Sequence, residues 1–322
     1  MRGFVCENGI LRPVANPLAE LDRLVWLDLV NPGRDDEARL ESELGIGIPT
    51  REEMDEIEIS SRIYTEDGAS FMTAILPAHT DGDDPQMAPV SFVLAKDKLI
   101  TVRYHEPRAF ATFPVRAEKV AMGCESGEGV LLALLEVIID RLADILERAG
   151  RDVEAISRDV FRDRGRKPTK SQDFQSTLER IGRKGDLTSN IRHSLVTFER
   201  LTGFLSQRSL QIKAGKDTRE RVKTLSRDIR SLEDHAGFLT QKITFLLDAT
   251  LGMINIEQNA IIKIFSVAAV VFLPPTLIAS IYGMNFEFMP ELAWTFGYPF
   301  ALGLMILSAV LPYLLFKRKG WL

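Results

Sequence analysis

The residues best suited to chemistry form a stripe near the C-terminus, in a stretch that is otherwise apolar. Their spacing alternates between three and four residues, which places them on one face of a helix. The stripe consists of Asn259, Ile262, Ser266, Ala269, Leu273, Thr276, Ser280 and Gly283, and it leads to Asn285. Its amide and hydroxyl oxygens are neutral acceptors that continue through the whole apolar segment, as in the lining of a pore. Stripes of small and polar residues also mark packing between membrane helices, so packing and a pore both remain open.

Two apolar segments must position this stripe. We expect spans at about 264–282 and 296–316, roughly 19 and 21 residues long and close to what a bilayer core requires. Lys317-Arg318-Lys319 follows the second span directly, which predicts a cytosolic C-terminus by the positive-inside rule. An even number of spans returns the N-terminal body to the same side. The sequence therefore predicts a multi-pass protein of the cytoplasmic (inner) membrane with both termini cytosolic.

The loop between the spans carries two acidic residues, Glu287 and Glu291, and no basic residue. We expect it to face outward and to concentrate cations at an entrance, although two carboxylates would equally keep a short loop solvated. One pair of spans cannot enclose an aqueous path. A pore therefore requires a ring of identical copies with the first spans inside.

Charge is distributed unevenly along the 322 residues. Among 40 basic and 45 acidic residues, only Lys263, Glu287 and Glu291 lie between Ile261 and Phe316. The tail from Ile261 onward carries +2, from four basic and two acidic residues, so the net charge of −5 leaves −7 on the body that precedes it. An acidic body disfavours a nucleic-acid partner and suits cations.

The N-terminal part mixes short apolar runs with turn-rich breaks, as strands with interspersed helices do. The runs are Val25–Leu27, Phe71–Leu76, Val90–Ala95 and Leu99–Val102. Thr50 followed by Glu52 and Glu53 predicts a helix N-terminus with apolar Met54, Ile57 and Ile59 beyond it. We expect residues 1–125 to form a cytosolic α/β domain.

From Gly129 the apolar residues recur at three and four positions, which predicts long helices. The first should end near residues 164–168, the second should run from Ser171 to Ile212, and the third should begin near Thr218 and continue into the first span. We expect residues 126–258 to be a cytosolic long-helix and stalk region, and residues 259–322 a pore region with two transmembrane spans.

Other functional classes find little support. The N-terminus lacks the features of a secretory signal, so we expect the body to remain in the cytosol. Cys6 and Cys124 are far apart and have no neighbouring His, so we interpret both as ordinary buried thiols. We find no nucleophile elbow, metal-protease motif or phosphate-binding loop, and we expect neither an enzyme nor an organic cofactor.

Several short motifs resemble those of the CorA magnesium transporters. The segment Tyr282-Gly283-Met284-Asn285-Phe286 contains the Gly-Met-Asn triplet that follows the first of two C-terminal spans in that family. Met289-Pro290-Glu291-Leu292 and the Lys317-Arg318-Lys319-Gly320-Trp321-Leu322 terminus add to the likeness. The stretch Ile254–Asn259 is similar to the proteobacterial branch, and a looser likeness covers the whole chain.

The resemblance implies a funnel-shaped homopentamer that passes divalent cations, with a long stalk helix continuing into the pore. It also implies an outer selectivity ring of Gly283, Met284 and Asn285, a pore-facing Asn259 at the inner mouth, hydrophobic constrictions at Ile262 and Leu273, and a hydroxyl ring at Thr276. The family's acidic ring near the stalk–pore junction matches Asp248. From this ring we expect gating by cytosolic Mg2+, so that Mg2+ is both transported and regulatory.

An Asn ring suits Mg2+ because this ion gives up its water reluctantly, and neutral oxygens can accept hydrogen bonds from the hydration shell. The membrane potential supplies about 4.6 kcal/mol per 100 mV for a divalent ion, twice the single-charge value, so no ATP motif is needed. Co2+ and Ni2+ are further candidate cargoes. A zinc transporter of the same architecture, and a membrane-anchored scaffold or sensor with an incidental stripe, are the alternatives.

Overall fold

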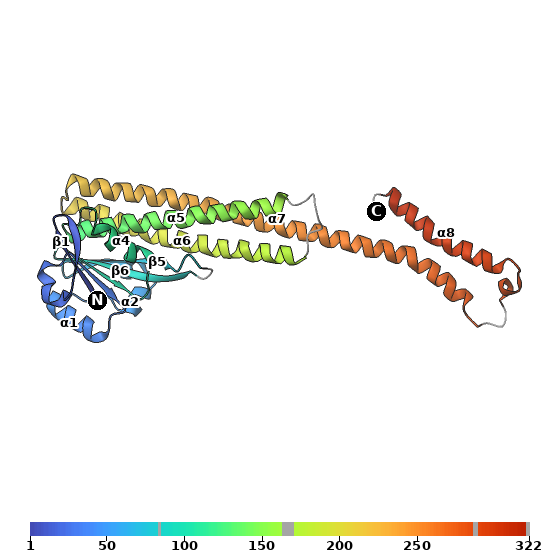
Figure 1. Cartoon of the computed structure of the whole chain (residues 1–322), viewed down its shortest axis with the longest axis horizontal. Helices are drawn as coiled ribbons and strands as arrows, with labels where there is room; N and C mark the ends of the chain where they lie inside the picture. The colour runs from blue at the N-terminus through green and yellow to red at the C-terminus, as the bar shows by residue number, and fades with distance from the viewer. Residues whose placement is uncertain (83–84, 163–170, 286–288, 320–322) are drawn as a thin grey trace. The chain divides into compact units, whose positions relative to one another are not determined.

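The computed structural model describes residues 1–82, 85–162, 171–285 and 289–319. The chain forms two compact units, Met1–Leu247 and Asp248–Leu322. Helix α7, Lys216–Tyr282, supplies residues to both of them (Figure 1).

The first unit is built on a seven-stranded sheet with the order β2-β1-β3-β7-β6-β5-β4. Its strands are β1 Arg2–Glu7, β2 Ile10–Val14, β3 Trp26–Val30, β4 Ile63–Glu66, β5 Ala69–Ala78, β6 Gln86–Ala95 and β7 Lys98–Arg103. Strands β3 and β7 are parallel, and the other neighbours pair antiparallel. The four apolar runs of the sequence are β3, β5, β6 and β7, so their prediction as strands is confirmed.

Helices cover both faces of the sheet. Successive side chains of a strand point to opposite sides, so each strand contributes to the apolar cluster on either face. In β7, Leu99 joins a large cluster with the long helices, whereas Ile100 and Val102 join a second cluster with the short ones. The helices of this unit are η1 Pro17–Arg23, α1 Arg34–Leu44, α2 Arg51–Asp55, α3 Ile59–Arg62, α4 Arg108–Ala117, α5 Gly127–Arg162, α6 Ser171–Gln211 and the start of α7.

Helix α2 begins as the sequence predicts. The Thr50 hydroxyl accepts a hydrogen bond from the Glu53 backbone N–H, and the Glu53 carboxylate accepts one from the Thr50 backbone N–H, which completes a capping box. Met54 is buried, but the helix ends at Asp55 and Ile57 is 89% exposed. The prediction that Ile57 extends the apolar face was therefore wrong. Cys124 is buried as expected, whereas Cys6 is only half-buried.

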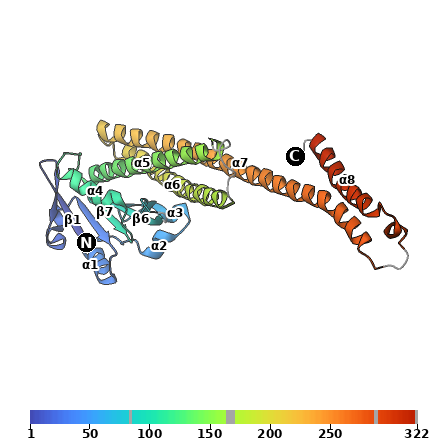
Figure 2. The same ribbon diagram turned by 45° about the vertical axis from the view of Figure 1, so that its right-hand side comes forward.

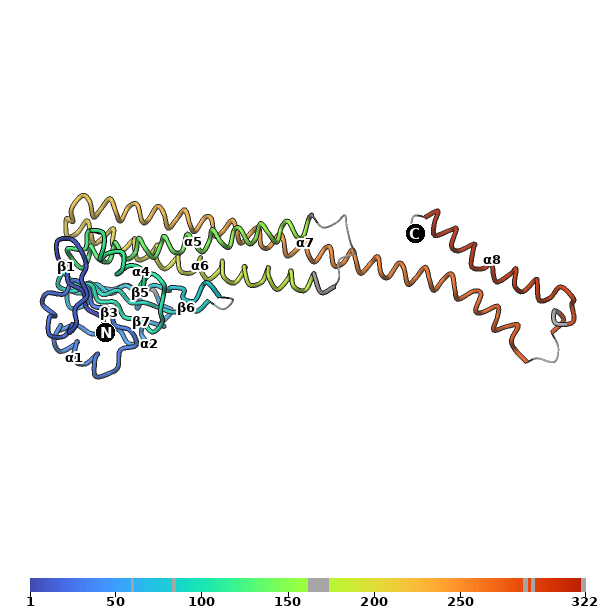
Figure 3. Tube along the Cα trace, in the orientation of Figure 1, coloured from blue at the N-terminus to red at the C-terminus, as the bar shows by residue number. Residues whose placement is uncertain are grey.

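Helices α5 and α6 lie against one face of the sheet, and the first part of α7 runs along these two helices (Figures 2 and 3). Their inward residues form one apolar cluster with the sheet, including Leu131, Phe198 and Ile229. Ion pairs between helices line its edges: Arg221–Glu136, Arg208–Glu128, Lys184–Asp152 and Lys242–Glu154. The long helices predicted from periodicity are confirmed, and the predicted end of the first one, near residues 164–168, lies outside the described residues.

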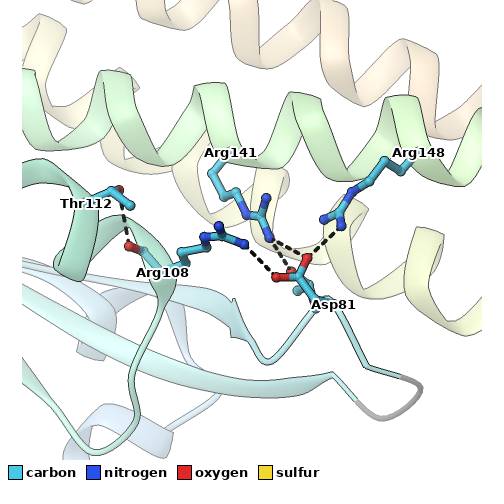
Figure 4. A network of polar contacts seen from close by, with 6 residues as sticks. Asp81, Arg108, Thr112, Arg141 and Arg148 are labelled. Carbon is cyan, nitrogen blue, oxygen red and sulfur yellow. Dashed lines mark hydrogen bonds and ion pairs between the residues drawn. The ribbon is translucent and has the colours of Figure 1, made fainter.

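Asp81, which lies just beyond β5, joins that strand to two helices (Figure 4). Its carboxylate accepts hydrogen bonds from Arg108 of α4 at 2.6 Å, and from Arg141 and Arg148 of α5 at 2.9 and 2.6 Å. The hydrogen bonds from Arg148 and Arg141 lower the pKa of Asp81 to about 2. The carboxylate is thus ionised at every physiological pH and acts as a clamp.

The second unit is a helical hairpin. It contains the C-terminal part of α7, the short helix η3 Pro290–Ala293 and α8 Gly297–Arg318, and α8 runs back beside α7 (Figures 1 and 2). The predicted second span, 296–316, agrees with α8 to within two residues at each end.

The Asp81 clamp predicts a local effect of its removal. Asp81→Asn should lower the hydrogen-exchange protection of the backbone from Ala78 to Gly82 about tenfold at pH 7, because three guanidinium groups lose their anion. In the unmodified protein the depressed pKa means that the clamp is complete above about pH 4 and is lost only as the pH falls through about 2. Hydrogen exchange read by mass spectrometry at pH 7 compares the variant with the unmodified protein. The same measurement on the unmodified protein at pH 4 checks that the clamp is still complete there. Asp152→Asn, which breaks a single ion pair with Lys184, is the matched control. Unchanged protection at Ala78–Gly82 in Asp81→Asn would contradict the assignment.

Candidate functional site

Helices α7 and α8 are both long and apolar enough to cross a membrane. Only 6% of the apolar window of each is buried within the chain. A 22-residue α-helix is about 33 Å long, which matches the hydrocarbon core of a bilayer. The exposed apolar side chains of α8, such as Tyr298 at 76% and Ile306 at 63%, therefore need a non-aqueous surrounding.

One face of each helix is turned toward the other. On α7 the buried and half-buried residues of the span gather on one side of the helix: Val267, Ala268, Val271, Pro274, Pro275, Ile278 and Tyr282. On α8 they are Gly297, Ala301, Met305, Ser308, Pro312 and Phe316. The small residues Gly297 and Ala301, at the start of α8, are buried.

The polar stripe lies on the other side of α7. All of its members are exposed in the single chain: Asn259, Ile262, Ser266, Ala269, Leu273, Thr276, Ser280 and Gly283. At about 100° per residue, their mean direction lies roughly 180° from that of the face that meets α8. The stripe therefore does not pack against α8. Helix packing within a single chain is excluded as its explanation.

The structure shows how one of the stripe's oxygens, that of Thr276, is held. The Thr276 hydroxyl donates to the Phe272 carbonyl at 2.7 Å. Its proton is used within the helix, so its remaining lone pairs point away from the helix axis as acceptors. Such an oxygen can accept a hydrogen bond from a water of a hydrated cation.

Pro274 and Pro275 lie on the α8 side of the helix and are half-buried. Helix α7 continues through them to Tyr282, although neither residue has an N–H to donate. The backbone carbonyls four residues earlier, Val270 and Val271, thus lack their usual helical donors.

At its outer end α7 finishes in two backbone hydrogen bonds, from Gly283 N–H to the Ala279 carbonyl at 2.9 Å and from Met284 N–H to the Ile281 carbonyl at 3.3 Å. Asn285 follows directly and is exposed, as are Gly283 and Met284. Of the two acidic loop residues, Glu287 lies outside the described residues, and Glu291 is in η3 without a described side chain.

Toward the N-terminus of α7 the stripe continues at the same spacing through Asn255 and Gly252 to Asp248. All three are exposed. Gly252 and Asn255 were not predicted as site residues, although the alternation of three and four residues would have found them. Asp248 is therefore on the same face of α7 as Asn259 and Ser266.

Comparison with known proteins settles the family. The CorA-like Mg2+ transporter protein family matches residues 22–318. This chain belongs to that family. The CorA-type relatives include the magnesium transport protein CorA of Escherichia coli K12, 40% identical over 100% of both chains, and that of Pasteurella multocida, 38% identical over the same share.

Solved structures support the CorA fold. The complete CorA magnesium transporter of Methanocaldococcus jannaschii superimposes with a TM-score of 0.78 at 19% identity and covers 100% of this chain and 98% of its own. The full-length CmaX protein gives 0.70 at 17% identity, with the same coverage. The predicted fold, an α/β domain with long helices and a two-helix transmembrane hairpin, is confirmed. The chain is a CorA-family membrane protein with its spans in α7 and α8.

Proposed function

We propose that this chain transports hydrated Mg2+ across the inner membrane through a pore lined by the stripe of α7. The observation that carries the proposal is the position of the stripe, opposite the face that meets α8. Polar oxygens on that side lie against lipid unless water or another subunit covers them. The full-length relatives named as magnesium transport proteins support the same cargo.

The pore requires several copies of the chain, because one hairpin cannot enclose water. The part of α7 that precedes the stripe bears large exposed apolar residues. Phe238 and Phe245 are seven residues apart and 57% and 60% exposed. Exposed apolar side chains at heptad spacing favour self-association. Together with the family's architecture they support a homopentamer, with α7 of each subunit toward the symmetry axis and a funnel of α/β domains on the cytosolic side.

Selectivity is assigned to Gly283, Met284 and Asn285 at the outer end. A ring of Asn285 amides supplies neutral oxygens to the hydration shell and leaves the ion its water. The loop carboxylates Glu287 and Glu291 would raise the local cation concentration at this entrance. Ions held through their water bind weakly enough to leave, as conduction requires.

Inside the pore, apolar and polar rings alternate. Ile262 and Leu273 are 60% and 65% exposed in the single chain, and rings of such residues can close a pore by dewetting. Asn259, Ser266, Thr276 and Ser280 supply oxygens between and beyond them. The membrane potential alone drives inward movement, and neither catalysis nor an organic cofactor is part of the mechanism.

The chemistry of the stripe bears on the cargo. Its donors are amide and hydroxyl oxygens, which suit Mg2+, whereas zinc usually prefers His and Cys. Co2+ and Ni2+ also form octahedral aqua ions, so a site that reads the hydration shell would admit them as well. A membrane-anchored scaffold would have no need of oxygens along the full length of a span.

Gating is assigned to Asp248. A symmetric ring places one carboxylate from each subunit on the pore side of α7, and these repel one another unless cations neutralise them. Cytosolic Mg2+ bound there, or between neighbouring acidic bodies, would hold the helices together and close the pore. Internal Mg2+ would thus limit its own uptake by favouring one of two states.

Asn285→Ala should abolish most Mg2+ uptake into proteoliposomes, by at least about tenfold, because the amide ring that reads the hydrated ion is lost. Size-exclusion chromatography should show an intact oligomer. Tyr298→Phe, on the exposed face of α8, is the control and should transport normally. Unimpaired flux in Asn285→Ala would rule out its role in selectivity.

Millimolar Mg2+ inside proteoliposomes should reduce uptake at least roughly fivefold, which is the fold-change at the lower end of typical allosteric coupling. Asp248→Lys should weaken this inhibition because the charge that binds the regulatory cation is reversed. Glu257→Lys makes the same charge change on the opposite face of α7, about two and a half turns further along, and should leave the inhibition intact. Inhibition that is equal in the two variants, or absent from the unmodified protein, would refute gating by Asp248.

A further inference from the structure

A second charged site lies in the first unit, between α6 and α7. A groove of about 540 Å3 runs between the two helices. Four cationic residues line it, all of them from α7: Arg219, Lys223, Arg227 and Arg230. Its other polar side chains are serines, including Ser206 and Ser226, and no acidic residue lines it. The volume falls in the range of small-molecule sites.

The positive charge of this groove is largely uncompensated. Elsewhere in the same layer the basic residues face acidic ones, as Arg221 faces Glu136 and Lys184 faces Asp152. In the groove, Arg230 donates through Nε to Glu199 of α6 at 2.9 Å. Within the described parts of the chain, Arg219, Lys223 and Arg227 form no salt bridge.

The cationic side chains of the groove repel one another when no anion is bound. Arg219, Lys223 and Arg227 are spaced four residues apart, so they lie above one another on the helix, where like charges repel. Nothing in the packing requires them, since all three are exposed. An anion with several charges would turn this repulsion into attraction. Guanidinium forks and an ammonium group in a row match successive phosphate groups, and serine hydroxyls can add hydrogen bonds.

We propose that the groove between α6 and α7 binds a soluble polyphosphate anion, of the class of inorganic triphosphate and nucleoside triphosphates. A lipid headgroup carries the same phosphate chemistry. The soluble source is favoured because the last lining residue, Arg230, precedes the start of the first span at Ile264 by about 34 residues of helix. The metal-free anion binds in preference to its Mg2+ complex, because Mg2+ cancels two of the charges that the groove attracts.

Gly203 of α6 provides a way to close the groove without disturbing the fold. It lines the groove, and a Cβ at this position would meet no atom within 4 Å. Gly203→Glu therefore adds a carboxylate to a groove lined by cations at a position where the new Cβ meets no neighbour. Gly203→Ala is the matched control, since it adds only a methyl group and favours the helix.

The test is isothermal titration calorimetry of the purified full-length protein with inorganic triphosphate and with ATP, in Mg2+-free low-salt buffer. We expect one site per subunit. The affinity should fall at least about tenfold in Gly203→Glu and in the double variant Lys223→Gln/Arg227→Gln, because the groove loses net positive charge. It should be retained in Gly203→Ala and in Lys213→Gln, which removes a nearby exposed charge outside the groove. Higher salt and equimolar Mg2+ should each weaken binding several-fold.

The outcomes separate the possible occupants. No binding by the unmodified protein, or equal binding by all variants, would overturn the proposal. So would binding to phosphatidylglycerol vesicles in the absence of triphosphate binding, which would assign the groove to lipid. Loss of the oligomer in the double variant, without triphosphate binding by the parent, would assign it to acidic residues of a neighbouring subunit. Because the readout is binding and not flux, the result does not depend on the proposed transport.

Discussion

A membrane helix with polar groups on one side and only one partner helix on the other is an incomplete structure. Helix α8 covers the face of α7 that carries Val267, Val271 and Ile278. The opposite face, with Ser266, Thr276 and other oxygen-bearing residues, has no partner within the described residues of its unit. Hydrocarbon cannot satisfy the remaining polar atoms on this face, which is why the proposed pore requires several subunits around it. In that proposal, assembly and conduction follow from the same geometric constraint.

The α/β unit and the hairpin meet different physical demands. In the first unit a fully buried salt bridge joins Asp28 to Arg103 across the parallel pair β3 and β7, and Thr101 and Trp26 extend the network. Buried charges of this kind need every partner present, which favours one well-defined arrangement. In the second unit most of the large apolar side chains that the structure describes are exposed. Helix α7 contributes residues to both units.

Much of this organisation could be predicted from residue patterns. Strands β3, β5, β6 and β7 follow from uninterrupted apolar runs, α2 from its capping box, and the spans from apolar length. Contacts between distant residues could not be predicted, because no local pattern encodes them. The Asp81 clamp and the cationic groove both depend on which helix lies beside which. Ile57 illustrates the same limit, since its helix ends two residues earlier. The stripe was visible in the sequence, but only the structure shows that α8 leaves it uncovered.

The most direct test of the account is the water accessibility of α7, residue by residue. Single cysteines are introduced at stripe positions Ser266, Ala269, Thr276 and Ser280, and at Val267, Val271 and Ile278 on the α8 side, in protein that lacks Cys6 and Cys124. Their reaction rates with a small water-soluble thiosulfonate are then measured in membranes. The account predicts fast reaction at the stripe positions and reaction at least about tenfold slower on the α8 side. Equal rates on the two faces, or faster reaction at Val271 and Ile278, would contradict it.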